Sequence, residues 1–194
     1  MLPPLRLIPL LCAASGLMAH VTGDLNSLVL QASRFVAHET AGPSQHRDLT
    51  LFRIIGTGGD GETPMHGVAD LQVWTLIYQV SSAEAPPPGR SDQDAQSLWV
   101  QCSHGLFSSM IWSPLPVFDA KSLQWAWFAL NLDDAVAKLE GLGHSRGFTS
   151  VTLMRPMHPR YSDECTFVFK CQSDHAYVGI SAQTGNELWT EPFP

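Results

Sequence analysis

The sequence predicts an α+β protein made of two tandem modules, each with one helix followed by three antiparallel strands. Two segments, 25–39 and 132–142, carry apolar residues at the spacing of an amphipathic helix. Each is followed by short segments rich in β-branched and aromatic residues, which are typical of strands. Segments 118–127 and 180–189 also match at four positions when set side by side without gaps. We therefore expect one extended antiparallel sheet with both helices on one face.

The composition is that of a globular protein. Of the 194 residues, 44% are hydrophobic and 15% are charged, so the chain has enough apolar material to fill a core. The formal net charge is −7, and Lys and Arg are not clustered. This charge balance argues against nucleic acid and anionic membrane surfaces as partners.

Residues 1–23 have the pattern of a secretory signal peptide. Arg6 precedes an apolar run over 7–19 that ends in small residues. The run is shorter than the ~20 residues of a spanning helix, and no later stretch is as long and apolar, so no integral membrane span is expected. Cys12 lacks the small preceding residue of a lipoprotein signal, so a lipid anchor is not expected. The sequence therefore predicts a secreted or periplasmic protein, and a mature N-terminal strand or helix is the alternative for this segment.

The first module is predicted over 24–127. Asp24 is a suitable cap for its helix. Strands are expected at 70–80 and 98–102, followed by a strand that two prolines break and that ends near Asp119.

The register of this first module is open between two interpretations. In one, two segments are surface elaborations: 49–64, which is partly glycine-rich, and 83–96, which is proline-rich. In the other, the apolar segment 49–55 is the first strand of the module.

The second module is predicted over 128–194. Asn131 is placed to cap its helix, and acidic residues fill the first turn, where the helix dipole favours them. Strands are expected at 148–154 and 166–171. Segment 176–189 then has the pattern of a hairpin, with a glycine in its turn.

The second module resembles the PepSY family. Its helix begins Leu132-Asp-Asp-Ala-Val-Ala-Lys-Leu, and its last strand runs into Ser181-Ala-Gln-Thr-Gly, where the family commonly has Asp-Ala-x-Thr-Gly. Ser181 thus replaces the usual Asp, whereas Asp119 of the first module keeps it but lacks the glycine. The resemblance implies a cystatin-like helix packed on an antiparallel sheet, an exported protein, and binding, often inhibitory, without catalysis.

Three cysteines remain once the leader is removed. Cys165 and Cys171 end one predicted strand, which would hold them ~20 Å apart, too far for a disulfide. A disulfide from Cys102 to one of them is therefore expected, with Cys171 preferred because it occupies the matching place in the second module, and three reduced, buried cysteines are the alternative. Because no Cys-x2-Cys or His-x3-His pair is present, we predict no metal site, and we expect no cofactor.

No catalytic residue is predicted, although the chain has eight histidines. The neighbours Ser103 and His104, like His144 and Ser145, point to opposite faces if they lie on strands, so neither pair makes a nucleophile with its base. An enzyme on this fold is the alternative, and it would depend on a histidine such as His104 or His175.

Trp112 and Trp125 are the predicted binding residues. Trp112 lies beside a proline break and Trp125 alternates with Trp127, so these two of the six tryptophans are expected to face outward. The expected function is that of a non-catalytic binding protein, such as an inhibitor or modulator of a secreted hydrolase or peptidase, with a protein or peptide partner. The alternatives are a small-molecule-binding protein and a structural component of an envelope assembly.

Overall fold

The computed structural model of the protein describes residues 24–39, 48–81, 96–117, 119–123, 129–157, 161 and 163–193. The predicted leader and Trp125 lie outside the described residues. The helices are α1 (Leu25–Glu39) and α2 (Leu132–Gly141). The strands are β1 (Asp48–Thr57), β2 (Val73–Ser81), β3 (Ser97–Ser103), β4 (Leu106–Ser113), β5 (Ala120–Lys121), β6 (Ser150–Pro156), β7 (Thr166–Cys171), β8 (Ala176–Ser181) and β9 (Glu187–Pro192). Short 3-10 turns lie at Val68–Asp70 and Gln172–Asp174.

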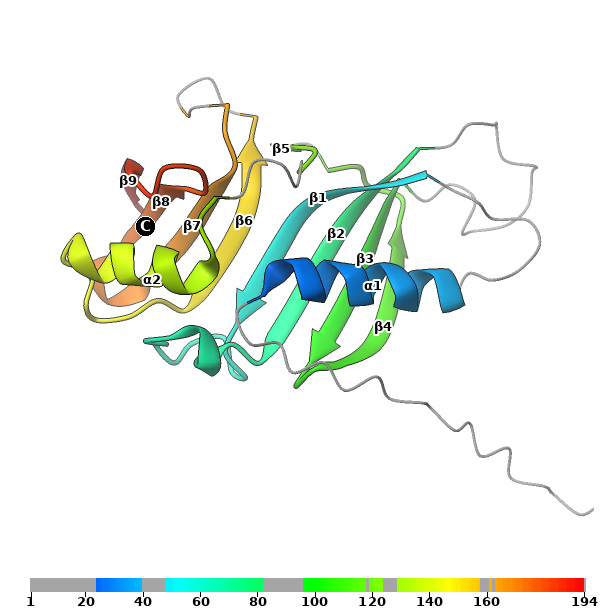
Figure 1. Ribbon diagram of the computed structural model, residues 1–194, viewed down its shortest axis with the longest axis horizontal. Coiled ribbons are helices and arrows are strands. Elements are labelled where there is room, and N and C mark those ends of the chain that lie inside the picture. Colours follow the sequence, from blue (N-terminus) through cyan, green and yellow to red (C-terminus); the bar gives the residue numbers. More distant parts are fainter. Residues whose placement is uncertain are drawn as a thin grey trace, which may run out of the picture.

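The strands form one nine-stranded antiparallel sheet, so the predicted α+β class is confirmed (Figure 1). The strand order is β4-β3-β2-β1-β6-β7-β8-β9, and β5 pairs with the end of β6. Strands β1 and β6 pair over Arg53–Thr57 and Ser150–Met154, which joins the two halves of the chain at the centre of the sheet. Each half therefore consists of a helix followed by a four-stranded meander, α1 with β1–β4 and α2 with β6–β9.

Each half has four strands in place of the three that the sequence predicts. In the first half, 48–57 is a true strand, so the interpretation that begins the sheet at 49–55 is the correct one. In the second half, both arms of the predicted hairpin are strands, β8 and β9, on either side of a turn in which Gly185 has φ +71°. The PepSY-like, cystatin-like character of the halves stays a prediction.

The gapless match between 118–127 and 180–189 does not mark equivalent positions. Of the first segment, the structure describes 119–123, where β5 pairs with β6 through Ala120↔Pro156 and Lys121↔Arg155. As the third and fourth strands of their half, β8 and β9 correspond to β3 and β4 of the first half. Four matching residues in ten are too few to fix a register when the turn glycine itself differs.

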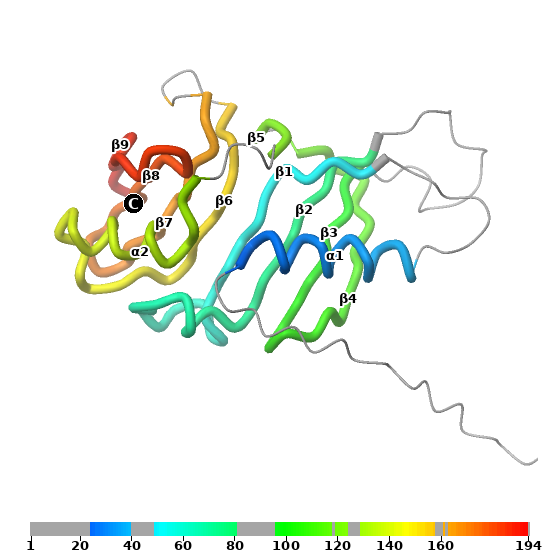
Figure 2. The backbone as a smooth tube through the Cα atoms, in the orientation of Figure 1, coloured from blue at the N-terminus to red at the C-terminus, as the bar shows by residue number. Residues whose placement is uncertain are grey.

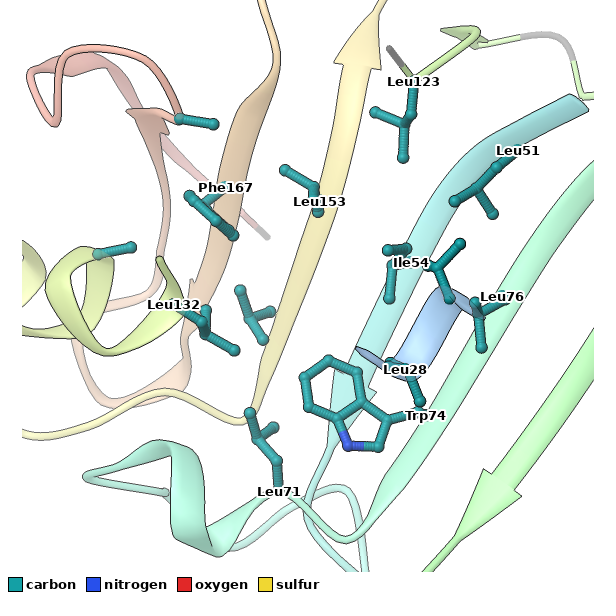
Figure 3. Close-up of a cluster of buried hydrophobic side chains, with 14 of the residues drawn as sticks. Leu28, Leu51, Ile54, Leu71, Trp74, Leu76, Leu123, Leu132, Leu153 and Phe167 are labelled. Atoms are coloured by element: carbon teal, nitrogen blue, oxygen red, sulfur yellow. The ribbon is translucent and has the colours of Figure 1, made fainter. Parts of the chain in front are cut away.

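One buried core lies between the helices and one face of the sheet. Ile54 of β1 pairs with Leu76 of β2 and with Leu153 of β6, and paired residues of antiparallel strands share a face. These side chains belong to the same buried cluster as Leu28 of α1 and Leu132 of α2 (Figure 3). Both helices therefore cover the same face of the sheet, α1 across β1–β4 and α2 beside β6–β8 (Figure 2).

The helix starts follow the sequence prediction. The Asn131 side chain accepts a hydrogen bond from the backbone N–H of Asp134 at 2.8 Å, as an N-cap residue does. Asp24 accepts one from the N–H of Asn26 at 3.0 Å. Among the described residues, neither helix combines the length and the apolar character needed to cross a bilayer.

Candidate functional site

The face of the sheet opposite the helices carries an exposed apolar patch on β3 and β4. Trp99 of β3 pairs with Ile111 of β4, and their side chains are 41% and 52% exposed. Leu115, just after β4, is 66% exposed. We call Trp99, Ile111 and Leu115 the Trp99 patch. Large apolar side chains exposed close together in this way are typical of a binding surface.

Hydrogen bonds hold the members of the Trp99 patch in place. The indole Nε1–H of Trp99 donates to Oγ of Ser97 at 3.2 Å. The Ser97 hydroxyl, on a residue that is only 1% exposed, donates in turn to the carbonyl oxygen of Leu115 at 2.7 Å. The segment after β4 is held further by the N–H of Val117, which donates to Oε1 of Gln79 at 3.0 Å. The patch is therefore preorganised, which lowers the entropy cost of binding.

The strand alternation explains why Trp99 is presented to solvent. Leu98, Val100 and Cys102 of β3 are fully buried on the helix side. Trp99 and Gln101 alternate with them and so lie on the open face. Ile77 of β2 pairs with Trp99 on the open face and is buried, so the patch rests on a packed base.

The predicted binding residues lie elsewhere. Trp112 pairs with the fully buried Leu98 and is half-buried against the core, on the face that α1 covers. Phe107, on the same strand, stacks on Phe35 of α1 with ring centroids 5.5 Å apart, which shows that α1 covers this part of β4. The prediction that Trp112 faces outward is therefore wrong, and a role for it in partner binding stays a prediction. Trp125 lies outside the described residues.

In the second half, two aromatic side chains on the open face pack on each other. Trp189 of β9 lies directly over Gly179 of β8 and stacks on Tyr161 with ring centroids 4.6 Å apart. The Tyr161 hydroxyl donates to Oε2 of Glu191 at 2.6 Å. Because these rings pack on each other, they present less free apolar surface than the Trp99 patch.

An ion-pair cluster fixes β5 against β6. Asp163 accepts two hydrogen bonds from the Arg155 guanidinium, both at 2.9 Å, and one from Lys121 at 2.8 Å. Lys121 first, and then Arg155, hold the pKa of Asp163 below its usual value. Asp119 pairs with Arg53, whose hydrogen bond lowers the pKa of that carboxyl. Each of these two carboxylates is paired with at least one cationic side chain, so the ion pairs tie the β5 segment to β1 and β6.

The predicted disulfide between Cys102 and Cys171 is wrong. Both thiols are free and fully buried. Cys102 lies on β3 and Cys171 on β7, and three strands stand between them in the sheet. At about 4.8 Å per strand, this places them ~19 Å apart, far beyond disulfide reach.

Two of the histidines considered for catalysis are turn residues. His104 has φ +48° in the β3–β4 turn, and His175 has φ +50° before β8. Both are exposed. The backbone conformation they adopt is uncommon for residues other than glycine, so turn formation explains their positions.

A third histidine belongs to a compact polar cluster that sequence spacing did not reveal. Nδ1 of His144 lies 2.8 Å from Oδ2 of Asp174, and the Cys171 thiol completes the group. Cys171 and Asp174 are close in sequence, but His144 comes from the connection between α2 and β6. Only the folded chain brings it to them.

Comparisons with known proteins identify a similar fold. No family model matches the chain, and no curated protein matches it either. A crystal structure similar to this fold is that of a protein from Clostridium difficile 630, described as a putative lipoprotein. The similarity covers 85% of this chain and 92% of that one, with a TM-score of 0.51 and 9% sequence identity. At this identity, the likeness shows a shared fold alone.

Proposed function

We propose that this chain is an exported, non-catalytic binding protein that holds a protein or peptide partner on the Trp99 patch. The observation that carries the proposal is a preorganised tryptophan with two exposed aliphatic neighbours, on the side of the sheet opposite α1 and α2. Tryptophan is enriched among the residues that dominate binding energy at protein interfaces. Among the described residues, β4 is the last strand of the sheet on this side, so its edge offers the same partner backbone groups for strand pairing beside the patch.

Export and the nature of the modules are part of the same proposal. The leader-like segment 1–23 and the PepSY-like sequence of the second half support an extracytoplasmic binding protein with tandem cystatin-like modules. The clostridial protein of similar fold is described as a putative lipoprotein, so the expectation that a lipid anchor is absent gains no support from it. An inhibitor or modulator of a secreted hydrolase is the form of this function that the PepSY resemblance favours.

The test is to capture a partner and then measure its affinity. Tagged protein is used as bait in extracellular and envelope fractions of the source organism, and retained proteins are identified by mass spectrometry. Affinities are then measured with the purified partner for the unchanged protein, Trp99→Ser and Leu142→Ser. Leu142 is the matched control, because it is also 41% exposed but follows α2 on the other side of the sheet.

We expect Trp99→Ser to weaken binding ~30-fold or more, the effect of losing a hot-spot residue worth about 2 kcal/mol. Leu142→Ser should leave the affinity unchanged. Equal affinities for Trp99→Ser and the unchanged protein would refute the proposed surface. If no partner is retained at protein concentrations well above micromolar, the binding function itself is wrong.

A further inference from the structure

His144, Cys171 and Asp174 form a cluster that the proposed binding function does not use. They come from two connections at the same end of the second half: His144 follows α2, Cys171 ends β7, and Asp174 lies in the turn before β8. The candidate ligand atoms, one from each side chain, all lie within 4.8 Å of one another. Cys171 belongs to the buried core on the helix side of the sheet, and three strands separate β7 from β3, so the cluster is remote from the Trp99 patch.

We propose that His144, Cys171 and Asp174 bind a zinc ion. Imidazole nitrogen, thiolate sulfur and carboxylate oxygen are the donors that Zn²⁺ takes in proteins. Three protein ligands leave the fourth tetrahedral position to water. The two anionic ligands and the neutral imidazole together balance the two positive charges of the ion.

The spacing of the cluster suits this ion after small side-chain movements. With Zn–N and Zn–O bonds of ~2.1 Å and one Zn–S bond of ~2.3 Å, tetrahedral ligand atoms stand about 3.4–3.6 Å apart. The hydrogen-bonded pair of His144 and Asp174, at 2.8 Å, would open by roughly half an ångström. The widest separation, at most 4.8 Å, would close by about 1 Å. Two of the three ligands lie in connections between elements, where such rotations are tolerated.

The cluster has two partly exposed side chains above a buried one, so an ion can enter from solvent. The side chains of His144 and Asp174 are 19% and 23% exposed, so an ion and a water ligand can reach them. The thiol of Cys171 is fully buried beneath them. On binding, Zn²⁺ takes the place of the thiol proton of Cys171, and this proton is released to solvent.

The same residues without an ion would form a structural hydrogen bond. In that case His144 ties the end of α2, where its N–H donates to the Leu139 carbonyl at 3.3 Å, to the β7–β8 turn. Cys171 would simply fill the core. The two interpretations differ in whether added Zn²⁺ binds stoichiometrically and whether the thiol becomes a ligand.

The experiment uses the full chain after treatment with a chelator, titrated with Zn²⁺ and separately with Co²⁺. We expect one equivalent of either ion to bind, a thiolate-to-cobalt charge-transfer absorption in the Co²⁺ form, and a higher melting temperature with Zn²⁺. Cys171→Ala and His144→Ala should each weaken Zn²⁺ binding by at least ~100-fold, since even outer-shell changes cost 10–100-fold. Asp174→Asn should weaken it while leaving the fold intact, because this side chain is partly exposed.

Cys165→Ala is the matched control, since Cys165 is also fully buried, just before β7, but outside the cluster. It should bind Zn²⁺ as the unchanged protein does. The proposal is overturned if the unchanged protein binds no Zn²⁺, or if His144→Ala and Asp174→Asn bind it as tightly as the unchanged protein. Both of these variants alter partly exposed side chains, so the test does not depend on whether Cys171→Ala folds. None of these outcomes depends on the partner-binding function, because the readouts need no partner.

Discussion

Substitution of Gly179 by alanine is expected to destabilise the second half of the sheet measurably. A Cβ at Gly179 would overlap Cε2 of the Trp189 indole and stand 2.6 Å from its Nε1. Real Cβ atoms do not approach other atoms so closely, so the indole must move off β8 and lose its stack on Tyr161, whose centroid lies 4.6 Å away. Overpacking of this kind costs ~1–3 kcal/mol. Alanine also lowers the conformational entropy of the unfolded chain, which stabilises the folded protein by about 0.4–1 kcal/mol and offsets part of this cost.

Gly179→Ala is therefore expected to lower the free energy of unfolding by about 1–2 kcal/mol, which corresponds to a fall of ~2–8 °C in Tm for a domain of this size. Urea unfolding followed by far-ultraviolet circular dichroism measures it. Gly67→Ala is the matched control, because a Cβ there meets nothing within 4 Å and its φ of −156° is extended backbone. The control should be neutral or slightly stabilising.

The cause is isolated by repeating Gly179→Ala in a Trp189→Ala background. Without the indole, the added methyl group has room, so the two substitutions should couple by about 1 kcal/mol or more. The reasoning is refuted if Gly179→Ala is as stable as Gly67→Ala, or if its cost is the same with and without the indole.

Three further predictions concern the described core and helix starts. Burial raises the pKa of Tyr78 to about 12, so between pH 10 and 12 the folded state keeps a proton that the unfolded state loses; stability should fall as pH rises through this window, by on the order of 2 kcal/mol. Urea unfolding of the unchanged protein and of Tyr78→Phe at pH 9, 10 and 11 checks this prediction, because the variant should lack the fall in stability that Tyr78 causes. An identical dependence of stability on pH in the two proteins would contradict it. Asn131→Ala should cost about 1 kcal/mol in the same assay through loss of its 2.8 Å cap to Asp134, whereas no loss would mean that the cap contributes nothing. Alkylation of unfolded protein without reductant should label both Cys102 and Cys171, because both thiols are free. Recovery of their two peptides joined by a disulfide would contradict this prediction.

Local patterns were sufficient to predict the helices and most strands. Apolar spacing and a capping residue define each helix within the segment itself, and both caps form as expected. Whether β1 is a strand of the sheet or a surface elaboration could not be decided in the same way, because β1 pairs with β6, about 100 residues later in the chain. Non-local pairing of this kind leaves no mark in a short window of sequence.

The site residues show the same limit. The exposure of Trp99 could have been read from the alternation of Leu98, Val100 and Cys102, since these three apolar residues define the buried face of their strand. Trp112 could not be placed by its neighbouring prolines, because its orientation is set by its pairing with Leu98. The cluster of His144 with Cys171 and Asp174 exists only because two connections meet in the fold.

The most direct test of the central claim is site-specific photo-crosslinking in the living source organism. A photoreactive amino acid replaces Ile111 in the Trp99 patch or, as a matched control, Leu30 on α1; the two side chains are 52% and 53% exposed, on opposite sides of the sheet. We predict a covalent adduct with one discrete partner from position 111 and none from position 30. An adduct from position 30 alone, or none from position 111, would contradict the assignment of partner binding to the face of the sheet opposite α1 and α2.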